Sequence, residues 1–78
     1  MWKKTKEGLE AELVFEDFKQ AFEFMTRVAH IAEEHQHHPE WHNAYNRVSI
    51  KLRTHDENNE VTEKDWNLAR AIESIATS

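Results

Sequence analysis

Histidine is the residue type whose number and spacing in this chain first indicate chemistry. Four of the six histidines crowd around the single proline: His35, His37, His38 and His42. An imidazole has an ordinary pKa of ~6.5, so it can give and take protons near neutral pH. A cluster of imidazoles at one point of the chain therefore predicts either acid/base catalysis or metal binding.

A zinc site is the first of these two interpretations to test against the spacing. Three neutral imidazoles and an open position would be needed, and His37, His38 and His55 are the candidates. Adjacent side chains in an extended segment point to opposite sides, and no H-E-x-x-H spacing places two ligands on one helical face. We therefore favour metal-free acid/base catalysis. The other histidines are interpreted as exposed polar residues: His30, His35 and His42.

Composition excludes several other classes of protein. Lys and Arg number 10 against 15 Asp and Glu, and the net charge of -5 disfavours direct binding to nucleic acid. The chain has no cysteine, no glycine-rich phosphate loop and no G-x-S-x-G sequence, so thiol, nucleotide and serine-hydrolase chemistry have no support. The longest apolar run is a triplet, Leu13 to Phe15, far short of the ~20 residues of a membrane span. We expect a cytoplasmic protein that does not bind membranes.

The elements that must position the histidines follow from hydrophobic periodicity, which first predicts two hairpins. Over residues 9–15 a period of two, typical of a half-buried strand, separates Leu9, Ala11, Leu13 and Phe15 from Glu10, Glu12 and Val14. Gly8 can turn the chain back from the segment before this strand. A later alternating stretch is divided by a turn at Asn46-Arg47 into strands near 41–45 and 48–54.

Spacings of three and four residues predict two helices. The first runs over about 17–35 and is limited by Pro39, which disfavours helical backbone in the residue before it. Its apolar stripe comprises Phe18, Ala21, Phe22, Met25, Val28, Ala29 and Ala32. The second opens at Thr62, because Asp65 three residues later completes a capping pattern. Its stripe comprises Trp66, Ala69, Ile72, Ile75 and Ala76.

This order of elements predicts one α+β domain over residues 1–78, with four antiparallel strands and both helices on one face of the sheet. A domain of this size buries only ~60% of its unfolded surface, and no disulfide reinforces it. We therefore expect a homo-oligomer, a dimer or a tetramer, built through sheet edges or helix faces.

Six short motifs and single residues are spread along the chain in a distinctive order. They are F-E-F-M-T-R at 22–27, Glu33, H-H-P-E-W at 37–41, Tyr45, T-H-D at 54–56 and Asp65. In this order and at these spacings they resemble the pterin-4a-carbinolamine dehydratase family, and the resemblance covers the chain from about Leu13 onward.

The resemblance implies loss of water from 4a-hydroxytetrahydrobiopterin, which gives quinonoid dihydrobiopterin and recycles the cofactor of an aromatic amino acid hydroxylase. No metal and no organic cofactor is implied. The hydroxyl on C4a must leave with a proton while N5 loses one, so an acid and a base must flank a flat ring. His37 and His38 are the implied acid/base pair, in an order left open, and His55 would help to hold the pterin and the leaving hydroxyl.

The resemblance also implies supporting and substrate-binding residues. Glu33 and Asp65 match its acidic positions, and a carboxylate beside an imidazole can fix its tautomer. The alternatives are a solvated helix residue for Glu33 and a capping role alone for Asp65. Substrate contact is implied for Pro39, Trp41 and Thr54, with core packing as the alternative for Trp41.

The N-terminal helix of longer relatives is expected to be missing, because the chain begins close to the first strand. Two other functions stay open. Some members of the family are dimerisation cofactors of a homeodomain transcription factor, so the chain could be a protein-binding module. It could also dehydrate another pterin, since catalytic histidines contact the ring more than its tail.

Overall fold

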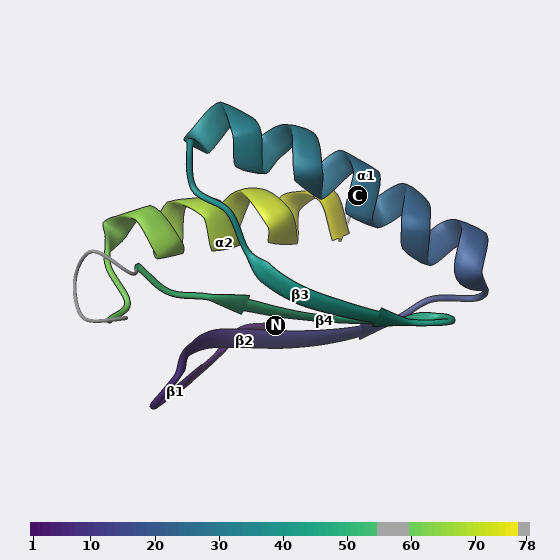
Figure 1. Cartoon of the computed structure of the whole chain (residues 1–78), viewed down its shortest axis with the longest axis horizontal. Helices are drawn as coiled ribbons and strands as arrows, with labels where there is room; N and C mark the ends of the chain where they lie inside the picture. The colour runs from purple at the N-terminus through teal and green to yellow at the C-terminus, as the bar shows by residue number, and fades with distance from the viewer. Residues whose placement is uncertain (55–59, 77–78) are drawn as a thin grey trace.

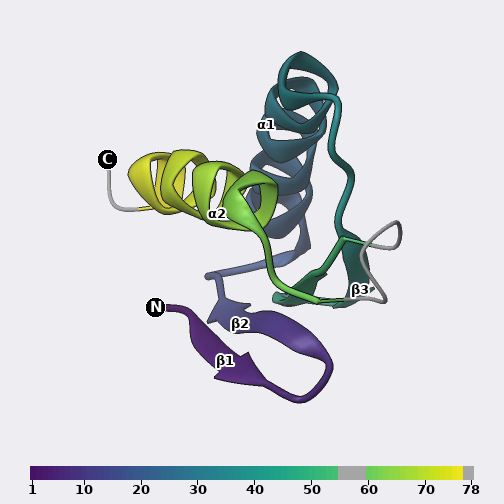
Figure 2. The ribbon, with the colours of Figure 1, turned by 90° about the vertical axis from the view of Figure 1, so that its left-hand side faces the viewer.

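Six secondary-structure elements follow the order β-β-α-β-β-α in the computed structural model, which describes residues 1–54 and 60–76 (Figure 1). The elements are β1 (Lys3–Thr5), β2 (Gly8–Val14), α1 (Phe18–His35), β3 (Glu40–Ala44), β4 (Arg47–Leu52) and α2 (Glu63–Ala76). The strands form one antiparallel sheet in the order β1-β2-β4-β3, and both helices lie on the same side of it (Figure 2). The predicted α+β fold is confirmed, with β1 as the first element of this chain.

Strand pairing sorts the side chains of the sheet onto two chemically different faces. Leu9 of β2 pairs with Leu52 of β4 on the face toward the helices, and neither side chain is exposed. One position along, Glu10 pairs with Lys51 on the face that the helices leave open. Further buried residues of the strands are Ala11, Val48 and Ile50. This alternation is the period of two expected for a sheet that is covered on one side.

The β1–β2 hairpin depends on Gly8. This residue has a φ of 134°, and a Cβ added there would lie 2.3 Å from the backbone oxygen of Leu52. Only glycine fits, because it has no side chain to meet the neighbouring strand. The predicted first hairpin is confirmed, and its turn lies at Lys6 and Glu7, just before the glycine.

The turn of the β3–β4 hairpin falls one residue earlier than predicted. Its central residues are Tyr45 and Asn46 rather than Asn46 and Arg47, and Tyr45 has a φ of 52°. Two-residue hairpin loops favour positive φ because their twist then matches that of the strands. Asn46 is held by Phe15, whose backbone N–H donates to the Asn46 oxygen at 2.7 Å and whose oxygen accepts from Asn46 Nδ2 at 3.0 Å.

Helix α1 starts where the sequence predicts, because Asp17 accepts a hydrogen bond from the Gln20 N–H at 2.9 Å. Its buried residues are Ala21, Phe24, Val28 and Ala32. The predicted stripe was therefore wrong in part: Phe18 is 48% exposed, Phe22 is 54% exposed and Ala29 is exposed, while Phe24 packs in the core. The physical reason is that α1 carries two neighbouring apolar stripes, and only the one containing Phe24 faces the sheet and α2.

Helix α2 completes the core through Leu68, Ala69 and Ile72. Trp66 was predicted on the buried stripe of α2 but is 40% exposed. Leu68 and Ile72 are buried instead, because their side of α2 packs against α1. Trp2 ties the N-terminal segment to this helix, since its indole N–H donates to the Ala69 oxygen at 3.0 Å.

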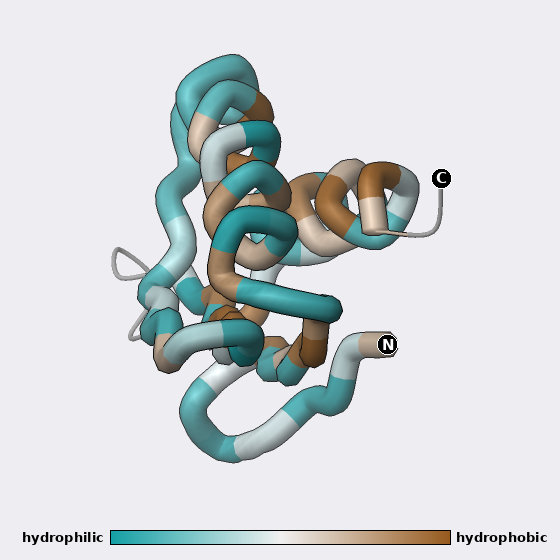
Figure 3. The backbone as a smooth tube through the Cα atoms, turned by 90° about the vertical axis from the view of Figure 1, so that its right-hand side faces the viewer, coloured by the Kyte–Doolittle hydropathy of each residue, from teal (hydrophilic) through white to brown (hydrophobic). Residues whose placement is uncertain are grey.

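Apolar and hydrophilic residues alternate along both helices, which is typical of helices with one buried face (Figure 3). Within residues 1–54 and 60–76, neither helix combines the length and the apolar character needed to cross a membrane.

Candidate active site

The candidate site begins where α1 ends. Gln36 adopts a left-handed conformation with a φ of 51°, and its N–H donates to the Glu33 oxygen at 3.2 Å. The N–H of His37 donates to the Ala32 oxygen at 3.2 Å, which satisfies another carbonyl at the helix end. The chain then leaves the helix axis toward Pro39 and β3, so His37 and His38 stand on a short connection between the helix layer and the sheet (Figure 1).

His37 is directed at the first turn of α2. Its Nε2 lies 2.6 Å from Oδ1 of Asp65, and the side chains of His37 and Asp65 are 12% and 0% exposed. Twenty-eight residues separate the two along the chain. The contact therefore forms only when the connection that follows α1 passes beside the first turn of α2.

The other oxygen of Asp65 is also occupied. Oδ2 accepts from the Thr62 N–H at 2.8 Å and from the Thr54 hydroxyl at 2.8 Å. The contact with Thr62 is the predicted capping interaction of α2. Asp65 thus caps the helix and contacts a histidine at the same time, so the two interpretations that were alternatives in the sequence are combined in one side chain.

His38 is directed the opposite way, back toward α1. Its Nε2 lies 2.5 Å from Oε2 of Glu33, and these side chains are 60% and 72% exposed. Adjacent histidines thus contact different carboxylates, one buried and one in solvent. This divergence agrees with the expectation that consecutive side chains of an extended segment point apart.

The other predicted site residues lie as follows. Thr54 is 4% exposed, with its hydroxyl directed at Asp65. Pro39 is half-buried, and Trp41 is half-buried and packs against the core, as its alternative interpretation expected. His55 lies outside the described residues. The histidines interpreted as surface residues are indeed exposed: His30, His35 and His42.

One residue of the site was assigned too small a role from the sequence. Thr62 was expected only to open α2, but its hydroxyl also lies 2.7 Å from the hydroxyl of Thr54. A threonine that caps a helix gives no local signal that its side chain also contacts a strand end. Only the docking of α2 beside the end of β4 reveals this contact.

The zinc site considered in the sequence would need His55, which lies outside the described residues. Over the described ranges, 1–54 and 60–76, no group of three histidine or carboxylate side chains is placed so that it could hold a metal ion. His37 and His38 each contact their own carboxylate rather than a common point.

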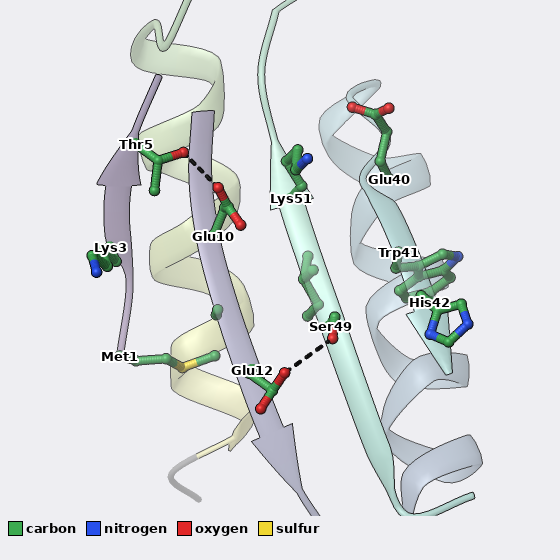
Figure 4. A pocket seen from close by; sticks show the side chains of 12 residues that line it. Met1, Lys3, Thr5, Glu10, Glu12, Glu40, Trp41, His42, Ser49 and Lys51 are labelled. Carbon is green, nitrogen blue, oxygen red and sulfur yellow. Dashed lines mark hydrogen bonds between the residues drawn. The ribbon is translucent and has the colours of Figure 1, made fainter. Parts of the chain in front are cut away.

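A separate hollow of about 640 Å³ lies over the open face of the sheet (Figure 4). Its polar side chains come from alternate positions of the strands, with Thr5 donating to Glu10 at 2.5 Å and Ser49 to Glu12 at 3.5 Å. His42 lines it, whereas His37 and His38 do not. The candidate site therefore belongs to the helix side of the sheet and is distinct from this hollow.

Comparison with known proteins agrees with the resemblance of the motifs. The family model described as pterin 4 alpha carbinolamine dehydratase matches residues 1–75. A protein of Christiangramia forsetii, provisionally named pterin-4-alpha-carbinolamine dehydratase, is 51% identical over 77 residues, which cover 99% of this chain and 78% of that protein. A protein of Rhodopseudomonas palustris with the same provisional name is 52% identical, over 91% of this chain and 69% of its own length.

A solved structure is similar as well. The crystal structure of a transcriptional coactivator/pterin dehydratase from Brucella melitensis superposes with a TM-score of 0.89 and 48% sequence identity. The match covers 96% of this chain and 81% of that one. The fold and the sequence are therefore similar to those of this group of proteins over nearly the whole chain.

Proposed function

The chain belongs to the pterin 4 alpha carbinolamine dehydratase family, and on that premise we propose that it converts 4a-hydroxytetrahydrobiopterin to quinonoid dihydrobiopterin and water. One observation carries the proposal: the 2.6 Å contact between His37 and the fully buried Asp65. A carboxylate that holds an imidazole in one orientation and one tautomer is a recurrent arrangement for a general base.

His37 is the base in this proposal. An ionised carboxylate accepts hydrogen bonds and donates none, so the contact with Asp65 assigns the proton of the neutral His37 ring to Nε2. Nδ1 is then the accepting nitrogen of that ring. It takes the proton from N5 of the pterin as the bond between C4a and the hydroxyl oxygen breaks.

His38 is the acid. It adjoins the base in the chain, is more exposed, and lies beside Glu33 on α1. Its protonated form donates to the hydroxyl on C4a, which leaves as water. One proton enters the substrate and one leaves it, so no further reactant is needed. By resemblance to the family, His55 holds the pterin and the leaving hydroxyl.

The physiological setting in this proposal is the recycling of tetrahydrobiopterin after an aromatic amino acid hydroxylase has used it. A different pterin is the alternative substrate. The ring system that carries the reacting atoms would be the same, so the roles of His37 and His38 would be unchanged.

The test is the absorbance change during dehydration of freshly generated 4a-hydroxytetrahydrobiopterin, with a chelator present. His37→Ala and His38→Ala should lose most of the acceleration, whereas His42→Ala, an exposed histidine of β3, should keep it. Equal rates in all three variants would refute the site. A parent protein that accelerates only another pterin would change the substrate, and one that accelerates none would favour a binding module.

A binding role has one structural observation in its favour. The outer stripe of α1 is defined as Phe18, Phe22, Met25 and Ala29. Met25 is half-buried against the core, the other three side chains are exposed, and the two phenylalanine rings lie 5.7 Å apart. Exposed aromatic side chains on one helix face are typical of a surface that another protein covers.

We propose that a second copy of this chain covers the outer stripe, with the two α1 helices antiparallel. The stripe repeats at spacings of four, three and four residues, as a seam between two helices does. In an antiparallel pair centred on the stripe, Phe18 of each copy lies beside Ala29 of the other, and Phe22 lies beside Met25. A tetramer would require a further pairing, for which the sheet edges are the candidates.

Size-exclusion chromatography with light scattering, which measures the molar mass of the protein as it elutes, tests this pairing. Phe22→Ser should lower the measured mass. Tyr45→Ser removes an aromatic ring that is 65% exposed on the β3–β4 turn rather than on α1, and should leave the mass unchanged. The same mass for the parent protein and Phe22→Ser would exclude the outer stripe as the interface.

A further inference from the structure

The hydroxyl of Thr54 is the least explained polar group near the candidate site. Thr54 follows β4, is 4% exposed, and is fixed by its backbone N–H, which donates to the Glu60 oxygen at 3.0 Å. Its hydroxyl contacts two groups of the site, Oδ2 of Asp65 at 2.8 Å and the hydroxyl of Thr62 at 2.7 Å. A buried hydroxyl with both of these partners is poorly placed to contact a substrate as well.

The chemistry of the three groups fixes the direction of the hydrogen bonds. A carboxylate oxygen only accepts, so the single hydroxyl proton of Thr54 is directed to Asp65. The proton between the two threonines must then come from Thr62, whose hydroxyl donates to Thr54. The donors form a chain from Thr62 through Thr54 to Oδ2 of Asp65, and each bond in such a chain polarises the next.

This chain fixes the plane in which the Asp65 carboxylate meets the histidine. Oδ2 accepts two donors, the Thr54 hydroxyl and the Thr62 N–H, so turning the carboxylate out of that plane would break both bonds. Oδ1 is thereby left directed at Nε2 of His37. Without the Thr54 hydroxyl, the backbone N–H of Thr62 would be the one remaining donor to Oδ2 among the described residues.

We propose that Thr54 is a positioning residue, which acts through Asp65 to hold His37 in the tautomer and orientation of a general base. The proposal rests on the proposed function, in which His37 takes the proton from N5. This role differs from the substrate contact that the resemblance implies for Thr54. Loss of a substrate contact would raise KM, whereas loss of a positioning residue would lower kcat.

Three variants test the hydroxyl. Thr54→Val keeps the shape of the side chain and removes the donor, and Thr54→Ser keeps the donor. Thr26→Val is the matched control, because Thr26 is an exposed residue of α1 whose hydroxyl donates to the Phe22 backbone oxygen of the same helix at 3.0 Å. We expect Thr54→Val to lower kcat about 10-fold with KM nearly unchanged, and Thr54→Ser to stay within about 2-fold of the parent, as for other residues that orient a reacting side chain.

A second readout does not depend on turnover. Nitrogen NMR of the histidine ring reports which nitrogen of His37 carries the proton. The parent, Thr54→Ser and Thr26→Val should show a proton on Nε2, whereas Thr54→Val should show a mixture of the two tautomers. If the parent fails to dehydrate the pterin, the proposed function fails, but this spectrum still decides whether Thr54 positions His37.

Several results would overturn the proposal. They are an unchanged kcat and spectrum in Thr54→Val, a raised KM at constant kcat, and equal damage from Thr54→Val and Thr54→Ser. If Thr54→Val does not fold, the proposal is tested on the parent protein by the exchange of hydroxyl protons with water. The Thr54 hydroxyl proton should exchange more slowly than the Thr26 hydroxyl proton. Equal exchange rates would refute the chain of donors.

Discussion

Replacement of Asp65 by asparagine should cut catalysis without unfolding the protein, because it changes hydrogen-bond direction at constant size. In one orientation, the asparagine oxygen accepts from Thr54 and Thr62 as the aspartate does, and its NH2 group faces His37. His37 must then accept at Nε2 and carry its proton on Nδ1, so the base is blocked. In the flipped orientation His37 keeps its tautomer, but the Thr62 N–H meets another donor.

The structure sets the magnitude of the effect. The flipped orientation, which keeps the productive tautomer of His37, leaves the half-buried N–H of Thr62 without an acceptor, and this costs about 1–3 kcal/mol. Since about 1.4 kcal/mol corresponds to a factor of ten, the population of the productive tautomer should fall about 5- to 150-fold. We expect kcat to fall within that range, and KM to change little because the shape of the site is kept.

The assay is steady-state dehydration combined with nitrogen NMR of His37. Asp17→Asn is the matched control, because it makes the same change of charge at the cap of α1, where asparagine caps as well as aspartate. A parent-like kcat in Asp65→Asn would refute the reasoning. So would a large loss of kcat in a variant whose His37 still carries its proton on Nε2.

Three further predictions concern the scaffold. Phe24→Ala should lower the free energy of unfolding by about 3–5 kcal/mol, because Phe24 is 5% exposed; Phe22→Ala, at 54% exposure, should lower it much less in urea titrations that report on the monomer. Gly8→Ala should cost about 2 kcal/mol or more, measured by thermal unfolding, since it combines a positive φ with a clash against β4; an unchanged melting temperature would contradict the geometry. The hydrogen bond from Lys51 holds the pKa of Glu7 below its ordinary value of 4.5, so this pair stabilises the fold above that pH, and its contribution disappears as the pH falls through the lowered pKa. Lys51→Met should therefore weaken the dependence of stability on pH in that acid range, and an unchanged acid titration of the melting temperature would show that the pair contributes nothing.

Most of the fold could be predicted because its signals are local. Alternation over residues 9–15, the helical spacing before Pro39 and the pair Thr62 and Asp65 each depend on neighbours in the chain, and the element each one predicts is present. The turn at Tyr45 was displaced by one residue because a bulky aromatic residue with a positive φ is not what turn preferences favour. Tertiary pairing of the two strands overrides that preference.

The choice between two apolar faces of α1 could not be made from the sequence. Phe22 and Phe24 are both large and apolar, and each completes a plausible stripe. Which of them is buried depends on how α2 and the sheet dock against α1. Periodicity predicts that one face is covered but does not distinguish two faces of similar hydrophobicity.

The candidate site was predicted as a set of residues but not as a set of pairs. His37 contacts Asp65 across two helices, while His38 turns back to Glu33. An extended segment predicts that the two side chains diverge, but not which carboxylate each of them contacts. That pairing follows from the left-handed residue Gln36, which ends α1 and sets the direction of the chain. The shared use of Asp65 by α2 and His37 is likewise a property of the packed structure.

That shared use links activity to local opening of the fold. Helix ends open and close far more often than a whole domain unfolds, and the first turn of α2 is held in part by the bond from the Thr62 N–H to Asp65. Each opening of that turn would also release His37. Heating should therefore inactivate the enzyme at a temperature at which the sheet is still folded. The temperature of half-inactivation would then report the stability of the first turn of α2 rather than the stability of the core.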